Sequence, residues 1–130
     1  MLDTNTVSHI VRGSQPRIQK RLLRTPMADL CISAVTEGEL QYGLAKRGHP
    51  RELSHRVSQF LLRVETLPWS SEVAQTYGIV RAEAEASGVV LGSLDMMIAA
   101  HAHAIGATLV SGDGAFGRLP GKRLVQDWTR

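Results

Sequence analysis

The sequence predicts an α/β fold, a three-layer α/β/α sandwich around a mainly parallel central sheet. Short apolar stretches alternate with longer segments of helical periodicity along the whole chain. Parallel strands need such helices to cross between them and to cover both faces of the sheet. The chain also has a suitable size, because 130 residues, 43% of them hydrophobic, can build one buried core. We therefore expect residues 1–130 to form a single domain.

The expected elements follow from apolar runs and from helix start and stop signals. Strands are expected at residues 1–5, 28–35, 65–69, 107–111 and 122–126, and helices at residues 14–24, 36–48, 51–64, 71–88 and 93–105. Ser14 is the expected N-cap of the first helix, with Pro16 in its first turn. Gly48 and Gly88 are expected to end two of the later helices.

The helix at residues 93–105 carries one aspartate in an otherwise apolar stretch. Ser93 is the expected N-cap, which places Asp95 in the first turn. There a carboxylate gains roughly 0.3–1 kcal/mol from the helix dipole, so helix initiation alone would account for Asp95. The residues expected on the buried face recur at helical spacing: Leu94, Met97, Ile98, His101, Ala102 and Ile105.

Four acidic residues fall where a parallel sheet collects its ligands, at or just past the carboxyl ends of strands. Each has a purely local alternative. Asp3 could be a cap, Glu39 could complete a capping box that begins at Thr36, and Asp113 could be a turn residue. Four such residues need not converge on one end of one sheet, so their convergence favours a shared site. The four are Asp3, Glu39, Asp95 and Asp113.

Converged carboxylates repel one another unless they are protonated or bridged by a cation. Oxygen-only ligands suit Mg²⁺ or Mn²⁺, so all four acids are the expected metal ligands and catalytic residues. Asn5 and Ser111 are expected to orient ligands or water as polar neighbours. Such a site predicts metal-assisted hydrolysis of phosphodiester bonds. The five histidines lack the spacing of a zinc site, since His101 and His103 point to different sides of one helix.

Basic residues are concentrated in two segments of a chain whose formal net charge is +3. Clustered basic side chains attract phosphate backbones, although most charge runs are simply solvated helix faces. No apolar run approaches the ~20 residues that span a membrane, and the single cysteine, Cys31, is expected to be a buried, reduced thiol in a cytoplasmic protein. The residues expected to contact a nucleic acid are Arg12, Arg17, Lys20, Arg21, Lys46 and Arg47.

At these residues the sequence resembles the PIN-domain ribonucleases, specifically the VapC-type toxins of bacterial toxin–antitoxin pairs. The resemblance covers nearly the whole chain through an ordered set of segments: MLDTN, CISAVTEGELQYGLAKR, LPW, YGIVRAEAEASG, GSLDMMIAAHA, LVSGDGAFGRLPG and DW. It implies that Asp3, Glu39, Asp95 and Asp113 form a Mg²⁺ or Mn²⁺ site that cleaves RNA, often tRNA and commonly initiator tRNA. It also implies a homodimer that is silenced by a cognate antitoxin, whose C-terminal segment lies across the active site.

Two positions depart from this family pattern. Gly112 stands where relatives often carry asparagine, which leaves open whether Asp113 binds the metal directly or through water. Ser70 stands where an aspartate commonly follows LPW, and it fits a helix cap.

Other functional classes fit the sequence less well. A haloacid-dehalogenase-like phosphatase needs a second aspartate where Asn5 stands. A receiver domain needs paired acids near its start and a late lysine at a strand end. The alternative that remains is a PIN-like module that binds RNA or a protein without cutting.

Overall fold

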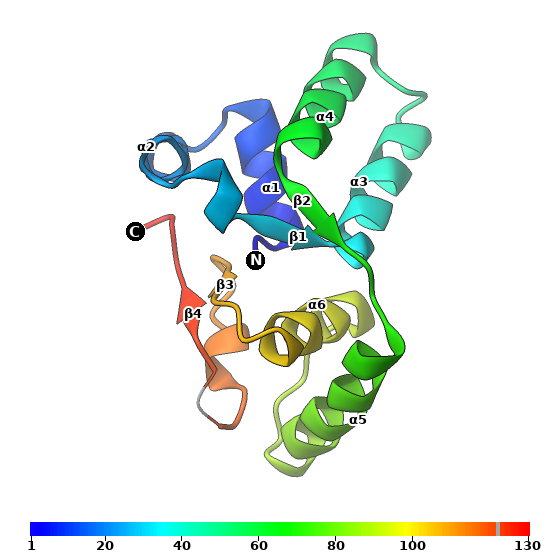
Figure 1. Cartoon of the computed structure of the whole chain (residues 1–130), viewed down its shortest axis with the longest axis vertical. Helices are drawn as coiled ribbons and strands as arrows, with labels where there is room; N and C mark the ends of the chain where they lie inside the picture. The colour runs from blue at the N-terminus through cyan, green and yellow to red at the C-terminus, as the bar shows by residue number, and fades with distance from the viewer. Residues whose placement is uncertain (122) are drawn as a thin grey trace.

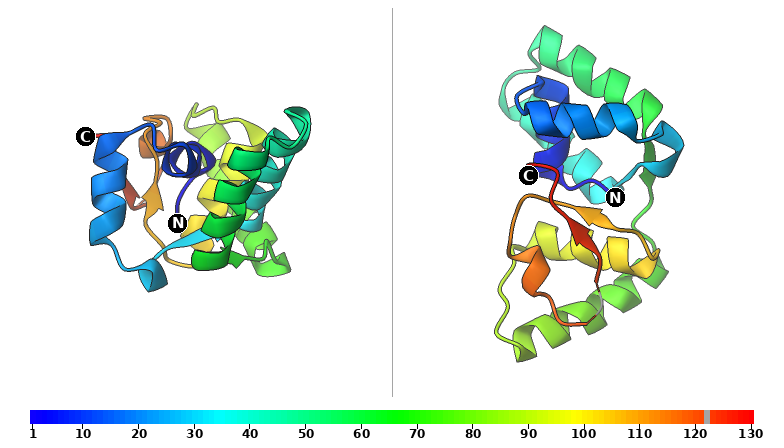
Figure 2. Two further views of the ribbon diagram at one scale, coloured as in Figure 1. Left: turned by 90° about the horizontal axis from the view of Figure 1, so that it is seen from above. Right: turned by 90° about the vertical axis from the view of Figure 1, so that its left-hand side faces the viewer.

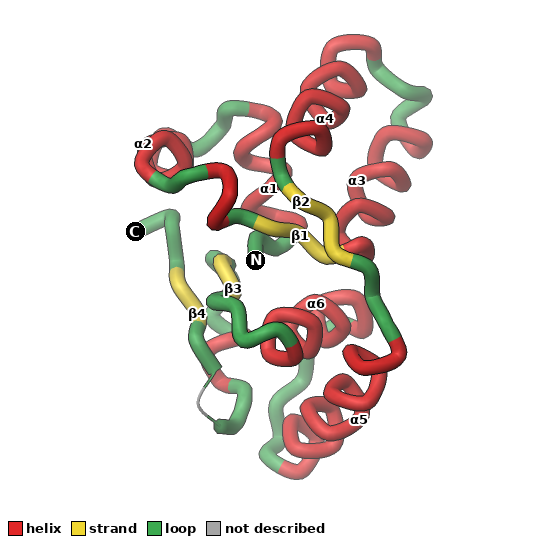
Figure 3. The backbone as a smooth tube through the Cα atoms, in the orientation of Figure 1, coloured by secondary structure: helices red, strands yellow, loops and turns green. Residues whose placement is uncertain are grey.

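The computed structural model describes residues 1–121 and 123–130 and shows helices on both faces of a short sheet (Figure 1). Strand β1 (Cys31–Ser33) pairs in parallel with β2 (Glu65–Leu67). Strand β3 (Leu109–Val110) pairs in parallel with β4 (Val125–Gln126). Figure 3 shows how short these strands are beside the helices.

The first three residues join the two strand pairs. The Leu2 N–H donates to the Cys31 carbonyl at 2.9 Å, and the Asp3 N–H donates to the Val110 carbonyl at 3.0 Å. Leu2 also forms a parallel bridge with Val110. The order across the sheet is therefore β2, β1, residues 1–3, β3, β4, which confirms the expected parallel sheet.

Neighbouring residues in these strands point to opposite faces, as the pleat of a strand requires. Leu2 and Ile32 are buried in one apolar core, whereas Met1 and Cys31 contact the other. The sheet therefore separates two cores, one under each helical layer. Cys31 is a free thiol, as expected, but it is only partly buried.

Four helices cover the first face: α1 (Thr4–Arg12), α2 (Pro16–Arg24), α3 (Ala34–Lys46) and α4 (Arg51–Arg63). A short 3-10 helix, Met27–Asp29, leads into β1. Val7, Ile18 and Phe60 bring α1, α2 and α4 into one core.

Two helices cover the second face, α5 (Ser71–Ala86) and α6 (Ser93–Ala104), together with a 3-10 turn at Phe116–Arg118. Figure 2 shows α5 and α6 on one side of the sheet and α1 to α4 on the other. This is the expected three-layer sandwich. In the part of the chain that the structure describes, no helix is long and apolar enough to cross a membrane.

The five expected helices are confirmed, with ends within two residues of those expected. The strands are shorter than expected, since only Cys31–Ser33 of residues 28–35 is a strand. The expected strand at 122–126 includes residue 122, which lies outside the described residues; its described part contains β4. Ser70 caps α5, because its Oγ accepts the Val73 N–H at 3.4 Å.

Helix α1 differs from the sequence-based expectation, which places a strand at residues 1–5. Its sequence, TNTVSHIVR, consists mostly of residues with weak intrinsic helix propensity. Tertiary packing of Val7 and Val11 in the core stabilises it instead. It ends at Gly13, whose φ of 64° lies in the left-handed region that favours glycine.

Two of the expected N-caps are wrong. Gln15, not Ser14, precedes α2, and the Ser14 hydroxyl pairs with His9 Nδ1 at 2.8 Å. Gly92, not Ser93, is the N-cap of α6, so Ser93 is its first residue. Both differences are one-residue shifts at a helix end, where several polar residues compete for the same role.

The buried face of α6 is only partly predicted by the sequence. Ile98, His101 and Ala102 are buried as expected, but Leu94 and Ile105 are 47% and 45% exposed. Other residues of α6 are buried instead of Leu94 and Ile105. The reason is that the sheet covers one side of α6 and α5 covers another. The additional buried positions are Met96, Ala99 and Ala100.

Candidate active site

Asp3 ends the central strand and begins α1. Its backbone is extended, and its Oδ1 accepts the Thr6 N–H at 2.8 Å, so it is the N-cap of α1. The residue is only 3% exposed. The strand–helix junction therefore fixes this carboxylate at the carboxyl edge of the sheet, where ligands of parallel sheets gather.

Glu39 lies in the second turn of α3 and is held by a residue that follows Asp3. The Thr4 hydroxyl donates to Glu39 Oε1 at 2.6 Å and lies 3.4 Å from the Thr36 hydroxyl. Ser33, not Thr36, is the N-cap of α3, with its Oγ accepting the Val35 N–H at 3.1 Å. The capping-box explanation of Glu39 is therefore wrong, because Glu39 lies too far along the helix to form one.

Asp95 is the third residue of α6 and is partly buried. Desolvation raises the pKa of its carboxyl group, and the negative charges of Glu39, Asp3 and Asp113 raise it further. These residues come from the starts of α1 and α6, the second turn of α3 and the segment after β3. The structure thus brings Glu39, Asp3 and Asp113 within electrostatic range of Asp95.

Asp113 lies on the exposed rim of this site. Its N–H donates to the buried Ser111 hydroxyl at 3.0 Å, and its Oδ1 accepts the Ala115 N–H at 2.9 Å. A Cβ on Gly112 would lie 3.2 Å from Thr129 Cγ2, so the C-terminal segment packs closely over this turn. Glycine at 112 leaves space that the Thr129 side chain fills.

Among the described residues, no three His, Cys, Asp or Glu side chains lie close enough together to enclose a metal ion. The four acids are an open group and not a closed cage. Such a group suits Mg²⁺, which keeps several waters and binds proteins through one or two carboxylates plus substrate phosphate. The raised pKa of Asp95 fits as well: desolvation is its main cause, the neighbouring carboxylates add to it, and a nearby cation would lower it.

The other predicted site residues lie in different parts of the structure. Ser111 contacts the Asp113 backbone, whereas Asn5 is exposed on the first turn of α1. Arg17 and Arg21 of α2 lie against the C-terminal segment: Arg17 donates to the Thr129 carbonyl at 3.2 Å, and Arg21 lies over the Trp128 ring at 5.7 Å.

Three arginines line a groove away from the acids. Arg12 and Arg47, together with Arg56, line an open groove of about 430 Å³ at the ends of α1 and α3. Lys46 instead lies over the Tyr42 ring at 5.9 Å.

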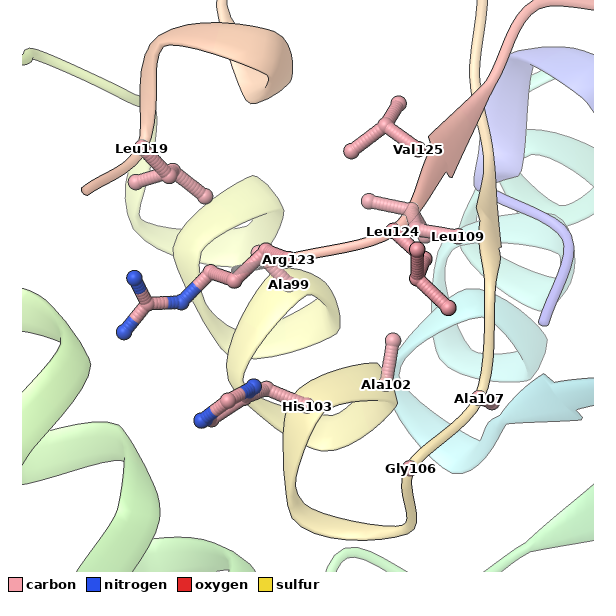
Figure 4. A pocket seen from close by; sticks show the side chains of 10 residues that line it. All are labelled: Ala99, Ala102, His103, Gly106, Ala107, Leu109, Leu119, Arg123, Leu124 and Val125. Carbon is pink, nitrogen blue, oxygen red and sulfur yellow. The ribbon is translucent and has the colours of Figure 1, made fainter. Parts of the chain in front are cut away.

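A further pocket, of about 180 Å³, lies between α6 and the strands β3 and β4, and none of the four acids lines it (Figure 4). It is lined mainly by apolar residues of α6, β3 and the segment before β4. Arg123 is its charged residue, and its Nη2 donates to Glu83 Oε2 at 2.8 Å. This pocket therefore does not belong to the acidic site.

Thr4 is a residue of the candidate site that sequence reasoning misses. A strand at residues 1–5 would place Asp3 and Asn5 on one face, which favours Asn5 as the polar neighbour. Since a helix begins at Thr4, it is Thr4 that reaches Glu39. Aspartate is a common N-cap residue, so Asp3 could have indicated this. A cap at Asp3 starts the helix at Thr4.

Comparisons with known proteins identify the family and the fold. A chain 36% identical to this one is the tRNA(fMet)-specific endonuclease VapC of Salmonella typhimurium, over 98% of this chain and 96% of that protein. Ribonuclease VapC2 of Rickettsia felis is 31% identical over 100% and 98% of the two chains. The solved structure of DNA-bound VapBC from Salmonella typhimurium superposes with a TM-score of 0.89 at 34% identity, covering 98% of this chain and 96% of that one. The PIN domain family matches residues 1–122, and the chain therefore belongs to the PIN domain family.

Proposed function

We propose that this protein is a metal-dependent endoribonuclease toxin that hydrolyses RNA phosphodiester bonds and is inhibited by a cognate antitoxin. The observation that carries the proposal is the group of four carboxylates at the carboxyl edge of the sheet: desolvation raises the pKa of Asp95, and the charges of Glu39, Asp3 and Asp113 raise it further. The acids come from separate elements, and the ion pairs found within residues 1–121 and 123–130 involve none of them. A divalent cation would supply the opposing positive charge.

Asp3, Glu39 and Asp95 would hold the ion, with Asp113 at the rim. When bound, Mg²⁺ or Mn²⁺ makes a water molecule more acidic and offsets charge on the leaving oxygen. The Thr4 hydroxyl holds the Glu39 carboxylate in place, and the N-cap hydrogen bond does the same for Asp3. Because Asp113 is exposed, it faces the side from which a phosphodiester backbone can approach.

The relatives support the choice of RNA and of a protein partner. Two of them are named as a tRNA(fMet)-specific endonuclease and a ribonuclease, and solved neighbours are VapBC toxin–antitoxin complexes. By analogy we infer that tRNA, with initiator tRNA as the first candidate, is the substrate here. We also expect a homodimer and an antitoxin whose C-terminal segment covers the acidic site.

Incubation of the purified, antitoxin-free protein with total tRNA tests the proposal. Discrete fragments are expected with Mg²⁺ or Mn²⁺, and none with EDTA or with Asp95→Asn. Sequencing of the fragment ends identifies the substrate and the cut position. A folded protein that binds tRNA but never cuts it would support the non-catalytic module instead, an alternative that the glycine at 112 keeps open.

A further inference from the structure

A buried polar contact joins the two helices that carry Glu39 and Asp95. His101 Nδ1 of α6 lies 2.7 Å from the Ser33 hydroxyl at the start of α3. The two residues are 1% and 0% exposed. Buried polar groups are costly unless they are hydrogen-bonded, so this contact has a strongly preferred geometry.

The hydrogen-bond roles in this contact follow from its partners. Burial lowers the pKa of His101, which favours the neutral imidazole. The Ser33 oxygen already accepts the Val35 N–H as the N-cap of α3. Its own proton needs an acceptor, and Nδ1 lies within hydrogen-bonding distance of the buried hydroxyl. The assignment that satisfies both groups has Ser33 donating to Nδ1 and the ring proton on Nε2.

From this contact, equal lengths of helix lead to the two carboxylates. Asp95 lies six residues before His101 on α6, and Glu39 lies six residues after Ser33 on α3. Each span is about 9 Å at 1.5 Å per residue. The two carboxyl groups lie on the same side of this contact, and Glu39 is the neighbouring charge that acts most on Asp95. A shift of α6 along α3 at the contact would therefore change the separation of the acids.

We infer that the Ser33–His101 hydrogen bond sets the separation of Glu39 and Asp95, which makes Ser33 and His101 positioning residues of the metal site. The inference rests on the proposed function. Repulsion between the carboxylates opposes their close approach when no cation is bound. The directional hydrogen bond between Ser33 and His101 fixes the position of α6 along α3 at this point.

Mn²⁺ affinity of the RNA-free protein, measured by titration calorimetry, tests the inference without relying on activity. His101→Phe keeps a flat ring beside a cavity of about 260 Å³ and removes the acceptor. Ser33→Ala removes the donor. Each variant is expected to weaken Mn²⁺ binding at least tenfold, as is typical when groups that orient metal ligands are removed. His101→Asn, whose amide oxygen can occupy the place of Nδ1, is expected to restore most of the affinity.

Two comparisons separate positioning from general stability. The double variant is expected to bind Mn²⁺ no more weakly than the weaker single variant, because both changes break the same bond. Trp69→Phe is the matched control, since it preserves a ring and removes a different hydrogen bond to α6, from Trp69 Nε1 to the Met97 carbonyl at 3.1 Å. It is expected to lower the melting temperature while leaving Mn²⁺ affinity unchanged.

Wild-type Mn²⁺ affinity in His101→Phe, additive losses in the double variant, or an equal loss in Trp69→Phe would each overturn the inference. If His101→Phe does not fold, unchanged affinity in Ser33→Ala overturns it. Failure of the proposed function looks different: a wild-type protein that binds no Mn²⁺ removes the metal site itself and this inference with it.

Discussion

Asp3 and Asp113 each use one carboxylate oxygen in a local turn. Oδ1 of Asp3 accepts the Thr6 N–H, and Oδ1 of Asp113 accepts the Ala115 N–H. A carboxylate has two oxygens and about four lone-pair sites, so a capping role does not compete with a ligand role. The local and functional interpretations of these acids, which look like alternatives in the sequence, are therefore compatible.

Asp95→Asn is expected to abolish RNA cleavage and to stabilise the metal-free fold at neutral pH. Desolvation and the neighbouring carboxylates raise the pKa of Asp95, so the folded state takes up a proton more readily than the unfolded state. The native carboxyl group therefore weakens the fold as pH rises from its unfolded-state pKa through its folded-state pKa. Urea unfolding of both proteins from pH 3 to pH 8 checks this.

The stability advantage of Asp95→Asn should disappear at the acidic end of that range, where the native carboxyl group is protonated in both states. A constant advantage at every pH would show that charge is not its source. Cleavage by Asp95→Asn at the wild-type rate would remove Asp95 from the site.

Thr4→Val is expected to lower kcat by roughly 10- to 100-fold, the usual cost of removing a group that orients a metal ligand. The change removes the hydroxyl that donates to Glu39 at 2.6 Å and keeps a β-branched side chain. Thr4→Ser keeps the hydroxyl and is expected to retain most of the activity. Steady-state cleavage of a defined tRNA gives kcat and KM separately, and an effect on KM alone would argue against this role.

Helix α2 is the element for which sequence and structure lead to different expectations. The sequence predicts that its basic residues bind RNA, but Arg17 and Arg21 also contact the C-terminal segment.

Two other basic residues predicted to bind RNA, Arg12 and Arg47, line a groove at the ends of α1 and α3. These helices begin beside the acids, so the groove lies about 13 Å from them along α1.

Replacing Arg17, Lys20 and Arg21 with glutamine is expected to weaken RNA binding and to flatten its salt dependence. For single-stranded RNA the slope of log affinity against log salt falls by about 0.7 for each phosphate that the protein no longer neutralises. Fluorescence anisotropy with uncut RNA in EDTA measures the slope. Arg51→Gln with Arg63→Gln, which removes two exposed charges of α4, is the control, and an unchanged slope in the triple variant would make α2 a solvated face.

At the scale of the whole molecule, residues 1–3 hold the two strand pairs together and separate the two cores. Leu2 is fully buried, in the core under α1 to α4, while Met1 packs in the core under α5 and α6. Because both layers share this central segment, we expect them to unfold together. Trp128 lies in the first core, and Trp69 contacts α6 and Tyr77 on the second face.

Single-tryptophan variants, Trp69→Phe and Trp128→Phe, therefore report on one layer each. Adding Leu2→Ala is expected to destabilise both by the same amount, about 2–5 kcal/mol for a buried leucine. Urea unfolding followed by tryptophan fluorescence checks this. Separate midpoints for the two tryptophans would show that the layers are independent.

The sequence by itself determined the order of the elements and which acids lie at the carboxyl ends of the strands. Five helices, the β1 to β4 positions and all four carboxylates could be predicted because periodicity, proline, glycine and acid positions are local signals. It did not determine α1 or the cap of α3, since weak helix formers such as those of Thr4–Arg12 need a core to pack against.

Only the tertiary structure decided how the acids are held. The Thr4–Glu39 bond joins residues that are 35 positions apart, and the Ser33–His101 bond joins residues that are 68 apart. No local pattern encodes such pairs, because they exist only once the sheet has set where each helix begins. The sequence supplies the carboxylates, and the packing of α1, α3 and α6 against one sheet edge brings Glu39, Asp3 and Asp113 near enough to Asp95 for their charges to act on it.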